Sequence, residues 1–459
     1  MSMTKNITEG NIYKNYLLYA LPLILSSILA SLYSTVDAVI AGKFISEHAL
    51  GAISSTASYD ILFQSLFTGF SGGFSIYIAQ LFGKGESASI KQNTVDMVAF
   101  TVMVSLGISA LSILFRNPVM NYLNIDPVLR RDAEIYFVIY TASYALAYAN
   151  MVLMRVLYAL GVTSFSIYVS LISALLNIGG NLFTVVVLNM GVAGLAISTV
   201  CSIAIVTVIY AVLLSRVFKE LGGPRVSCRF SLKCVRNSLI YTVPAAIQKL
   251  AFHATGIFIA PAINGLGADA TTGYSVMSRM YNICGQSFWN MSSAVDCHTA
   301  QSVGAGDYKK AKRGLSAGFF MNVAALTPFV LVFVFFAEPI ASIFFPSGYT
   351  GAAFDYAVRF FKAYAAFLYI NMIGHLMHSY MRSIGRVNTV LWVTLFGSVV
   401  KIVSTLMLIP RFHIDGIYMG NVLSWLADGA LSVVIYFLFY HSERKIKAVI
   451  DGIHHRKAM

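Results

Sequence analysis

The chain has 459 residues, of which 58% are hydrophobic and only 11% are charged. A soluble domain carries about 25% charged residues, so this chain cannot cover a water-exposed surface and is expected to be a polytopic membrane protein. The formal net charge of +13 would also suit nucleic acid, but basic cytoplasmic loops facing anionic lipid explain it in a membrane chain, so no nucleic-acid partner is expected.

The first apolar stretch, residues 16–42, is longer than the roughly 20 residues that a membrane-spanning helix needs. It carries Pro22 near one end and Asp37 near the other, with Tyr33 one turn before Asp37. A carboxylate at membrane depth is costly, so Asp37 is predicted to be functional, and Tyr33 is a candidate for a cargo cavity. Pro22 removes one backbone hydrogen bond, which predicts either a hinge in this helix or a static kink.

Apolar stretches of membrane-spanning length recur along the whole chain, separated by Gly, Pro, Asn or charged clusters. The sequence predicts twelve spans, at about 16–42, 49–82, 94–115, 133–159, 164–188, 191–216, 237–264, 271–302, 315–345, 355–383, 388–410 and 415–440. An even number of spans puts both ends of the chain on the same side of the membrane.

The positive charges predict which side that is. The loops on the side of the termini hold 22 Lys and Arg residues, against seven on the other side, so both termini are expected in the cytoplasm of a cell with this protein in its inner (plasma) membrane. The predicted domains are an N-terminal lobe at 1–215, a basic cytoplasmic linker at 216–236, a C-terminal lobe at 237–441 and a basic cytoplasmic tail at 442–459.

Similar residues recur in the two halves at a nearly constant separation of 221 to 224 residues, which indicates an internal duplication. The recurring features are Pro22 with Pro244, the segment 79–85 with 300–306, Gly161 with Gly385, and Gly194 with Gly416. Six spans per half start both copies on the same side, so the fold class is an all-α polytopic protein with twelve transmembrane helices in two pseudo-symmetric six-helix lobes. The transport pathway is expected between the lobes.

These features together resemble the multidrug and toxic compound extrusion (MATE) transporters. The similarity covers the whole chain and includes the proline of the first span, the VDxxxxGxxI pattern from Val36 to Ile45, the AQxxGxG-like ends of spans two and eight, and the small-residue turns LYALGVT and YMRSIGR. The resemblance implies a secondary antiporter that exports amphipathic small organic molecules or drugs by alternating access, coupled to H⁺ or Na⁺. It implies no enzyme activity and no cofactor.

The resemblance also implies a cation site at Asp37, Asn177, Asn181 and Thr199, as in the archaeal and DinF-like branches of the family. Many relatives have a second Asp at the position of Asn181. The NorM-like branch uses acids on spans seven and ten, where this chain has Phe252 or His253 and Asn371. The chain is therefore expected to be closer to the DinF-like branch.

The chemistry of these residues agrees with a hard cation. Asn177 and Asn181 are four residues apart, so their side chains lie on one face of a helix and can direct two amide oxygens at one point. An oxygen-only set suits Na⁺ and not zinc or copper. A buried Asp37 could equally bind and release a proton. The two asparagines could instead form only an interhelical hydrogen bond. The sequence leaves a Na⁺ site, a proton site and a structural hydrogen bond open.

The second half lacks this site. By the repeat offset, Lys401 takes the position of Asn177 and Ile259 the position of Asp37. We hypothesise that Lys401 pairs with Asp296 or Asp428 and blocks cation binding in this lobe; the alternative is a lysine that reaches toward the membrane surface.

Three further cations lie within spans: Lys249 and His253 on span seven, and Arg279 on span eight. They could form a basic wall of the substrate cavity, with Asn371 and Tyr33, or neutralise carboxylates such as Asp60 and Asp296.

Other classes fit less well. An ATP-driven pump would need a GxxxxGK[ST] loop, which is absent, and the near-matches to protease motifs have the wrong spacing, so neither a pump nor a membrane-embedded enzyme is favoured. The main alternative is a flippase of the same superfamily for a lipid-linked substrate, which would need a wide, cationic central cavity. A monomer in the lipid bilayer with a small organic substrate is expected.

Overall fold

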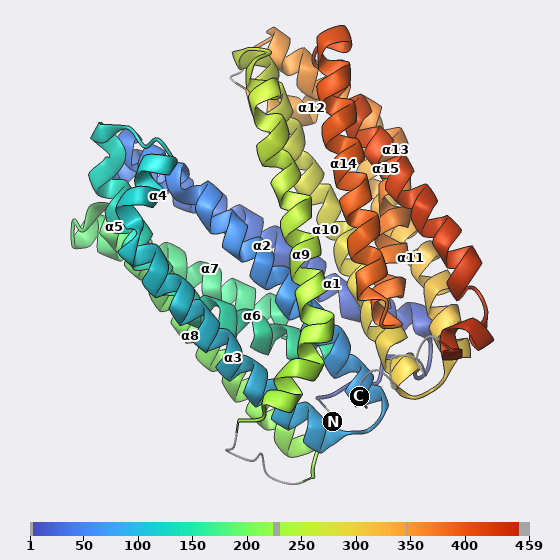
Figure 1. Ribbon diagram of the computed structural model, residues 1–459. Helices are drawn as coiled ribbons and strands as arrows, with labels where there is room; N and C mark the ends of the chain where they lie inside the picture. The colour runs from blue at the N-terminus through green and yellow to red at the C-terminus, as the bar shows by residue number, and fades with distance from the viewer. Residues whose placement is uncertain (1–2, 224–229, 346–347, 449–459) are drawn as a thin grey trace. The chain divides into compact units, whose positions relative to one another are not determined.

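The computed structural model describes residues 3–223, 230–345 and 348–448, without the side chains of residues 32–35, 38, 39, 47 and 50. All regular structure in these ranges is helical (Figure 1). The long helices of the first half are α1 (Ile12–Ile40), α2 (Glu47–Gly83), α3 (Ser87–Leu114), α5 (Pro127–Ala142), α6 (Tyr144–Ala159), α7 (Ser166–Leu182) and α8 (Gly191–Glu220). Those of the second half are α9 (Leu232–Asn264), α10 (Ala268–Gly304), α11 (Tyr308–Phe335), α13 (Ala352–Ser383), α14 (Val387–Phe412) and α15 (Asp415–Ile435). Shorter pieces are α4 (Arg116–Tyr122), α12 (Ala337–Ser342) and the π-helical turns η1 (Ala41–Ile45), η2 (Phe183–Val187) and η3 (Tyr436–Tyr440).

The helices account for the predicted spans. Nine helices within the described ranges are long and apolar enough to cross a membrane, and the pair α5 and α6, bent by 46°, adds a tenth. The helices α10 and α13 have 37 and 32 residues, which is ample length, but they carry more polar residues. With these two, the segments of membrane length come to the predicted twelve, and the all-α polytopic fold class is confirmed.

The duplication is visible in the backbone. After α2 and α10, both of 37 residues, Gly85 and Gly306 adopt φ angles of +74° and +76°. The turns after α6 and α13 place Gly161 and Gly385 at φ angles of +77° and +88°. These left-handed conformations favour glycine at each position, so the pairs that the sequence matched perform the same task in both halves.

Tertiary contacts divide the chain into two compact units: unit 1 is residues 1–6 and 25–242, and unit 2 is residues 7–24 and 243–459. The predicted lobes instead place all of α1 in the first half. The first part of α1 groups with unit 2 because Tyr16 Oη donates to Gly314 O at 3.0 Å and the Ile7 amide donates to Gln301 Oε1 at 3.1 Å. The helix α8 also continues to Glu220, into the predicted linker, and α9 starts at Leu232 within it; residues 224–229 of the linker and 449–459 of the tail lie outside the described residues.

In unit 1 a glycine sets the distance between the two helices that carry the predicted amide and hydroxyl ligands. A methyl group built on Gly180 of α7 would lie 3.3 Å from Ser198 Cβ of α8 and even closer to its hydroxyl. Ser198 Oγ in turn donates to the carbonyl oxygen of Asn177 at 3.1 Å. The two helices therefore meet closely beside Asn177 and Asn181.

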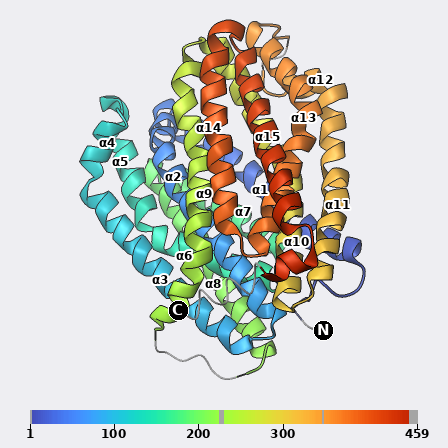
Figure 2. The ribbon, with the colours of Figure 1, turned by 45° about the vertical axis from the view of Figure 1, so that its right-hand side comes forward.

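In unit 2 the helices α13, α14 and α15 meet in the same way (Figure 2). A methyl group on Gly420 would lie 2.8 Å from Cα and 2.9 Å from the backbone nitrogen of Thr405. Gly374 and Gly397 leave room for the side chain of Asp428, which a methyl group at either position would crowd. This close packing surrounds a polar cavity in unit 2.

Candidate functional site

The four residues predicted to bind a cation lie together in unit 1. Asn181 Nδ2 donates to Asp37 Oδ1 at 2.7 Å and to Asn177 Oδ1 at 3.1 Å, and Asn177 Nδ2 donates to Thr199 Oγ1 at 3.2 Å. Three helices contribute: α1 supplies the carboxylate, α7 both amides and α8 the hydroxyl. Both asparagines are fully buried and Asp37 is partly exposed, so the cluster combines one charge with neutral oxygen groups.

The amide of Asn177 has two possible orientations in the cluster, of which the second pairs its nitrogen and oxygen better with their neighbours. In the first, its oxygen faces the carboxylate side and accepts from Asn181. In the other, its Nδ2 donates to Asp37 Oδ1 at 2.6 Å and Oδ2 at 3.1 Å, while its oxygen accepts from Thr199 Oγ1 at 3.2 Å. The same side chain can thus either present an oxygen to a cation or satisfy the carboxylate itself.

The donor set of this cluster fits a hard cation. Asn181 Oδ1 is buried and has no hydrogen-bond partner in the described part of the chain, and a buried oxygen of this kind is a ready ligand for a cation or a bound water. All four side chains offer oxygen, and no group of three or more His, Cys, Asp or Glu residues that could hold a metal ion occurs among the described residues. The chemistry suits Na⁺ or a proton better than a transition metal.

The predicted substrate residues separate into two groups. Lys249, Asn371 and Lys401 line a cavity of about 130 Å³ in unit 2. His253 and Arg279 do not line it and are exposed. The predicted basic wall therefore includes Lys249 but not these two residues. The side chain of Tyr33 lies outside the described residues.

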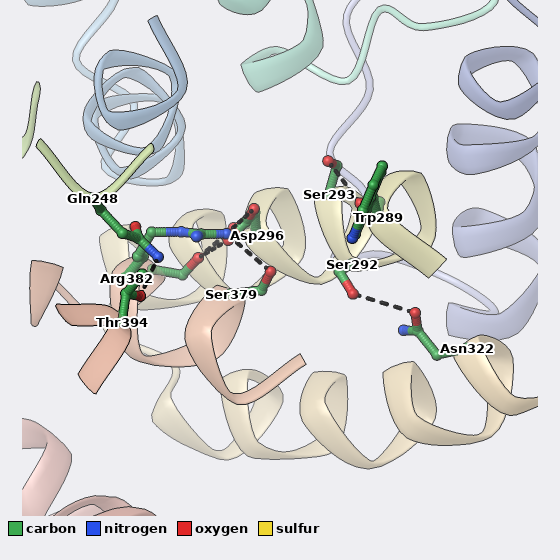
Figure 3. A network of polar contacts seen from close by, with 10 residues as sticks. Gln248, Trp289, Ser292, Ser293, Asp296, Asn322, Ser379, Arg382 and Thr394 are labelled. Atoms are coloured by element: carbon green, nitrogen blue, oxygen red, sulfur yellow. Dashed lines mark hydrogen bonds and ion pairs between the residues drawn. The ribbon is translucent and has the colours of Figure 1, made fainter. Parts of the chain in front are cut away.

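The predicted pairing of Lys401 with Asp296 or Asp428 is absent, which corrects the hypothesis from the sequence. Asp296 Oδ2 accepts from Arg382 at 3.2 Å (Figure 3), and Asp428 Oδ1 lies 3.3 Å from His378 Nε2. Lys401 forms no ion pair within 4.0 Å in the described ranges. Arg382 and His378 lie on α13, which packs against both α10 and α15, and their side chains reach the two carboxylates. Lys401 of α14 lines the same cavity as Asp428 but does not approach it within 4.0 Å.

Sequence reasoning missed a second acidic site in unit 1. Asp60 of α2 accepts a hydrogen bond from Tyr144 Oη at 2.5 Å and faces a cavity of about 160 Å³. Four tyrosines at intervals of four residues line this cavity: Tyr136, Tyr140, Tyr144 and Tyr148. That spacing puts them on one helix face and is visible in the sequence, but it continues across the bend between α5 and α6.

The ion pair of unit 2 gives a stability prediction. Arg382→Met should lower the free energy of unfolding by about 3 kcal/mol, because it leaves the largely buried carboxylate of Asp296 without its cation. Lys401→Met should not lower stability, since its ammonium has no carboxylate partner in the described ranges. Thermal unfolding of the purified variants measures both effects. As a control, adding Asp296→Asn to Arg382→Met should recover part of the lost stability. If Lys401→Met instead destabilised the protein more than Arg382→Met, the result would support the pairing of Lys401 with Asp296 or Asp428 that the sequence suggests.

Comparison with known proteins gives one family. A sequence model of the MatE family matches residues 22–183 and 244–407, so it matches once in each repeat and starts at Pro22 and Pro244. "Probable multidrug resistance protein YoeA" of Bacillus subtilis (strain 168) is 23% identical over 470 residues, 98% of this chain and 98% of that protein. "FAD transporter" of Shewanella oneidensis is 23% identical over 66% of this chain and 68% of its own length.

Solved structures show the same fold. A MOP superfamily transporter from Pyrococcus furiosus superposes with a TM-score of 0.87 at 16% identity, covering 97% of this chain and 99% of that chain. An outward-facing multidrug resistance MATE family transporter gives a TM-score of 0.84 at 16% identity and the same coverage. Since the family model matches most of both repeats, the resemblance is confirmed: the chain belongs to the MatE family of membrane transporters and is not an enzyme.

Proposed function

We propose that this protein is a cation-coupled secondary antiporter of the plasma membrane that exports amphipathic small organic molecules by alternating access. The observation that carries the proposal is the cluster of Asp37 with Asn181, Asn177 and Thr199 inside unit 1. Relatives named as multidrug resistance proteins support the cargo class. The Asp37 cluster and the neutral Asn371 in unit 2 favour the DinF-like branch, and the charge bias of the loops supports cytoplasmic termini.

The cluster explains how an ion could drive the cycle. A charged Asp37 at membrane depth is costly, and either Na⁺ or H⁺ removes that net charge when it binds. The two amide orientations of Asn177 would correspond to the ion-bound and ion-free states. In the first its oxygen can coordinate Na⁺, and in the second its NH₂ group can donate to the carboxylate of Asp37 after the ion has left. Ion binding and release would thus change hydrogen bonds between α1 and α7, which is what a coupling site needs in order to favour one conformation over another.

Asp37→Asn should abolish gradient-driven efflux because the amide keeps the shape of the side chain but cannot carry or lose the charge. The measurement is efflux of the dye cation ethidium from proteoliposomes of the full chain, under an imposed Na⁺ gradient and, separately, an imposed proton gradient. The gradient that drives the native protein identifies the ion. Asp96→Asn, which changes a buried carboxylate of unit 1 outside the cluster, should leave efflux intact; undiminished efflux by Asp37→Asn would overturn the mechanism.

Pro22 is the proposed hinge. It lies inside α1, and the division between the two units falls between Ile24 and Leu25, two residues beyond it. A proline removes a hydrogen bond from the helix ladder, so α1 can bend there at low cost. The bend would link the cluster at Asp37 in unit 1 to the part of α1 that packs with unit 2.

Pro22→Ala should lower the efflux rate several-fold while leaving Na⁺ or proton binding at Asp37 unchanged, because it stiffens α1 without touching the cluster. Efflux rates and calorimetric ion binding on the same preparation separate the two effects. Pro328→Ala changes a proline inside α11 and serves as the control. An efflux rate equal to that of the native protein would favour the static kink.

The cavity at Asp60 is the proposed cargo site of unit 1. Its single carboxylate lies among tyrosine rings that contact one another: Tyr136 and Tyr140 stack with ring centroids 5.6 Å apart at 9°, and Tyr144 and Tyr148 are tilted by 39° with centroids 5.1 Å apart. No ion pair of Asp60 occurs among the described residues. Aromatic faces around a carboxylate attract organic cations.

Asp60→Asn should weaken binding of benzyltrimethylammonium by about tenfold, the loss expected when one charged partner is removed. It should leave the binding of benzyl alcohol, which has the same aromatic ring without the charge, unaffected. Ligand-observed NMR on the purified protein measures both, and Asp96→Asn is again the control. Unchanged binding of the cation would exclude Asp60 from the cargo site.

A further inference from the structure

Unit 2 contains a polar cavity that the proposed coupling cycle does not use. Residues of five helices line it: α9, α10, α13, α14 and α15. Its volume is about 130 Å³, close to the roughly 150 Å³ of a cavity that holds one benzene molecule. The space therefore suits a group of about the size of one ring.

The charges around this cavity are mainly positive. Lys249, Arg382 and Lys401 line it, against a single carboxylate, Asp428. Arg382 pairs with Asp296, and Asp428 lies beside His378. Lys401 has no carboxylate within 4.0 Å in the described part of the chain. An ammonium within a membrane helix that no carboxylate contacts is unfavourable, and the cations that line this cavity outnumber its one carboxylate, so the cavity favours an anion.

One wall of the cavity is aromatic. Tyr281 and Trp425 stack with ring centroids 5.7 Å apart at an interplanar angle of 16°, and Tyr364 lies 5.0 Å from Trp425. Asn371 donates to Tyr281 Oη at 2.6 Å and Asn421 to Tyr364 Oη at 2.7 Å. These bonds fix the rings in place. A preformed aromatic wall beside a lysine suits a flat ring that carries a negative group.

The repeat supports the sign of the charge. Lys401 and Ile259 occupy the positions that Asn177 and Asp37 hold in unit 1. Ile259 is fully buried in the apolar core of unit 2, so no acid faces Lys401 from that position. Of these two pairs of positions, unit 1 has its charge at Asp37, a carboxylate, and unit 2 has its charge at Lys401, an ammonium.

We propose that the cavity of unit 2 is a binding site for a small organic anion, with Lys401 facing a carboxylate or phosphate group and the wall of Tyr281, Tyr364 and Trp425 facing the attached ring. The site goes beyond the proposed ion-coupled export and does not depend on it, because binding can be measured without a gradient. The site would give the transporter a second ligand class, opposite in charge to the cation expected at Asp60.

The test compares one ring with three charges. Benzoate, benzamide and benzamidine are anionic, neutral and cationic molecules of nearly the same shape, and phenyl phosphate replaces the carboxylate by a phosphate. Calorimetric titration of the purified full-length protein should show binding of benzoate, phenyl phosphate or both, and weaker binding of benzamide. Lys401→Met should lower anion affinity by about tenfold or more and should not weaken benzamidine binding.

Matched variants separate this site from the others. Arg279→Gln removes an exposed cation outside the cavity and should leave benzoate binding unchanged, as should Asp37→Asn, so failure of ion coupling and failure of this site give different results. Lys401→Gln serves if Lys401→Met does not fold. The absence of anion binding to the native protein, or equal anion affinity in both lysine variants and the native protein, would overturn the proposal and leave Lys401 as a fixed charge only.

Discussion

A charge within a membrane-spanning helix must find its partner inside the protein, because the surrounding lipid offers no hydrogen bonds. The carboxylates at membrane depth show how this chain meets that constraint. Asn181 donates to Asp37, Tyr144 donates to Asp60, and Arg382 pairs with Asp296. The partners differ in kind: an amide or a hydroxyl leaves the negative charge in place, whereas an arginine cancels it. Of these three carboxylates, Asp37 and Asp60 therefore keep a negative charge that can attract a cation.

Much of the fold follows from local patterns in the sequence. Apolar length predicts the spans, and the recurrence of Gly85 with Gly306 and of Gly161 with Gly385 predicts the duplication, since each glycine ends a helix with a positive φ angle. The amide pair of the site is equally local, because a spacing of four residues places Asn177 and Asn181 on one face of α7. Their meeting with Asp37 and Thr199 follows from the family resemblance and not from spacing alone.

The remaining features depend on which helices pack together, and spacing along the chain does not determine that. Opposite charge alone suggests an ion pair between Lys401 and Asp296. However, α13 packs against α10, the helix of Asp296, and supplies Arg382 as the partner instead. The tyrosines around Asp60 belong to two helices joined by a bend of 46°. Their spacing of four residues places them on one helix face, but it does not predict the bend or the cavity that they line together with Asp60. The division of α1 between the units likewise rests on tertiary contacts of Tyr16 and Ile7.

The two halves keep one backbone plan and differ in charge at equivalent places. A duplicated lobe with a second copy of the carboxylate could bind a second cation, and the ions would then compete for control of one conformational change. Lys401 and Ile259 argue against that arrangement, because an ammonium repels cations and an isoleucine cannot bind one. The same substitution places in unit 2 an ammonium that no described carboxylate approaches within 4.0 Å. In the proposed cycle, this asymmetry assigns ion binding to one half and leaves the other half free for a ligand of opposite charge.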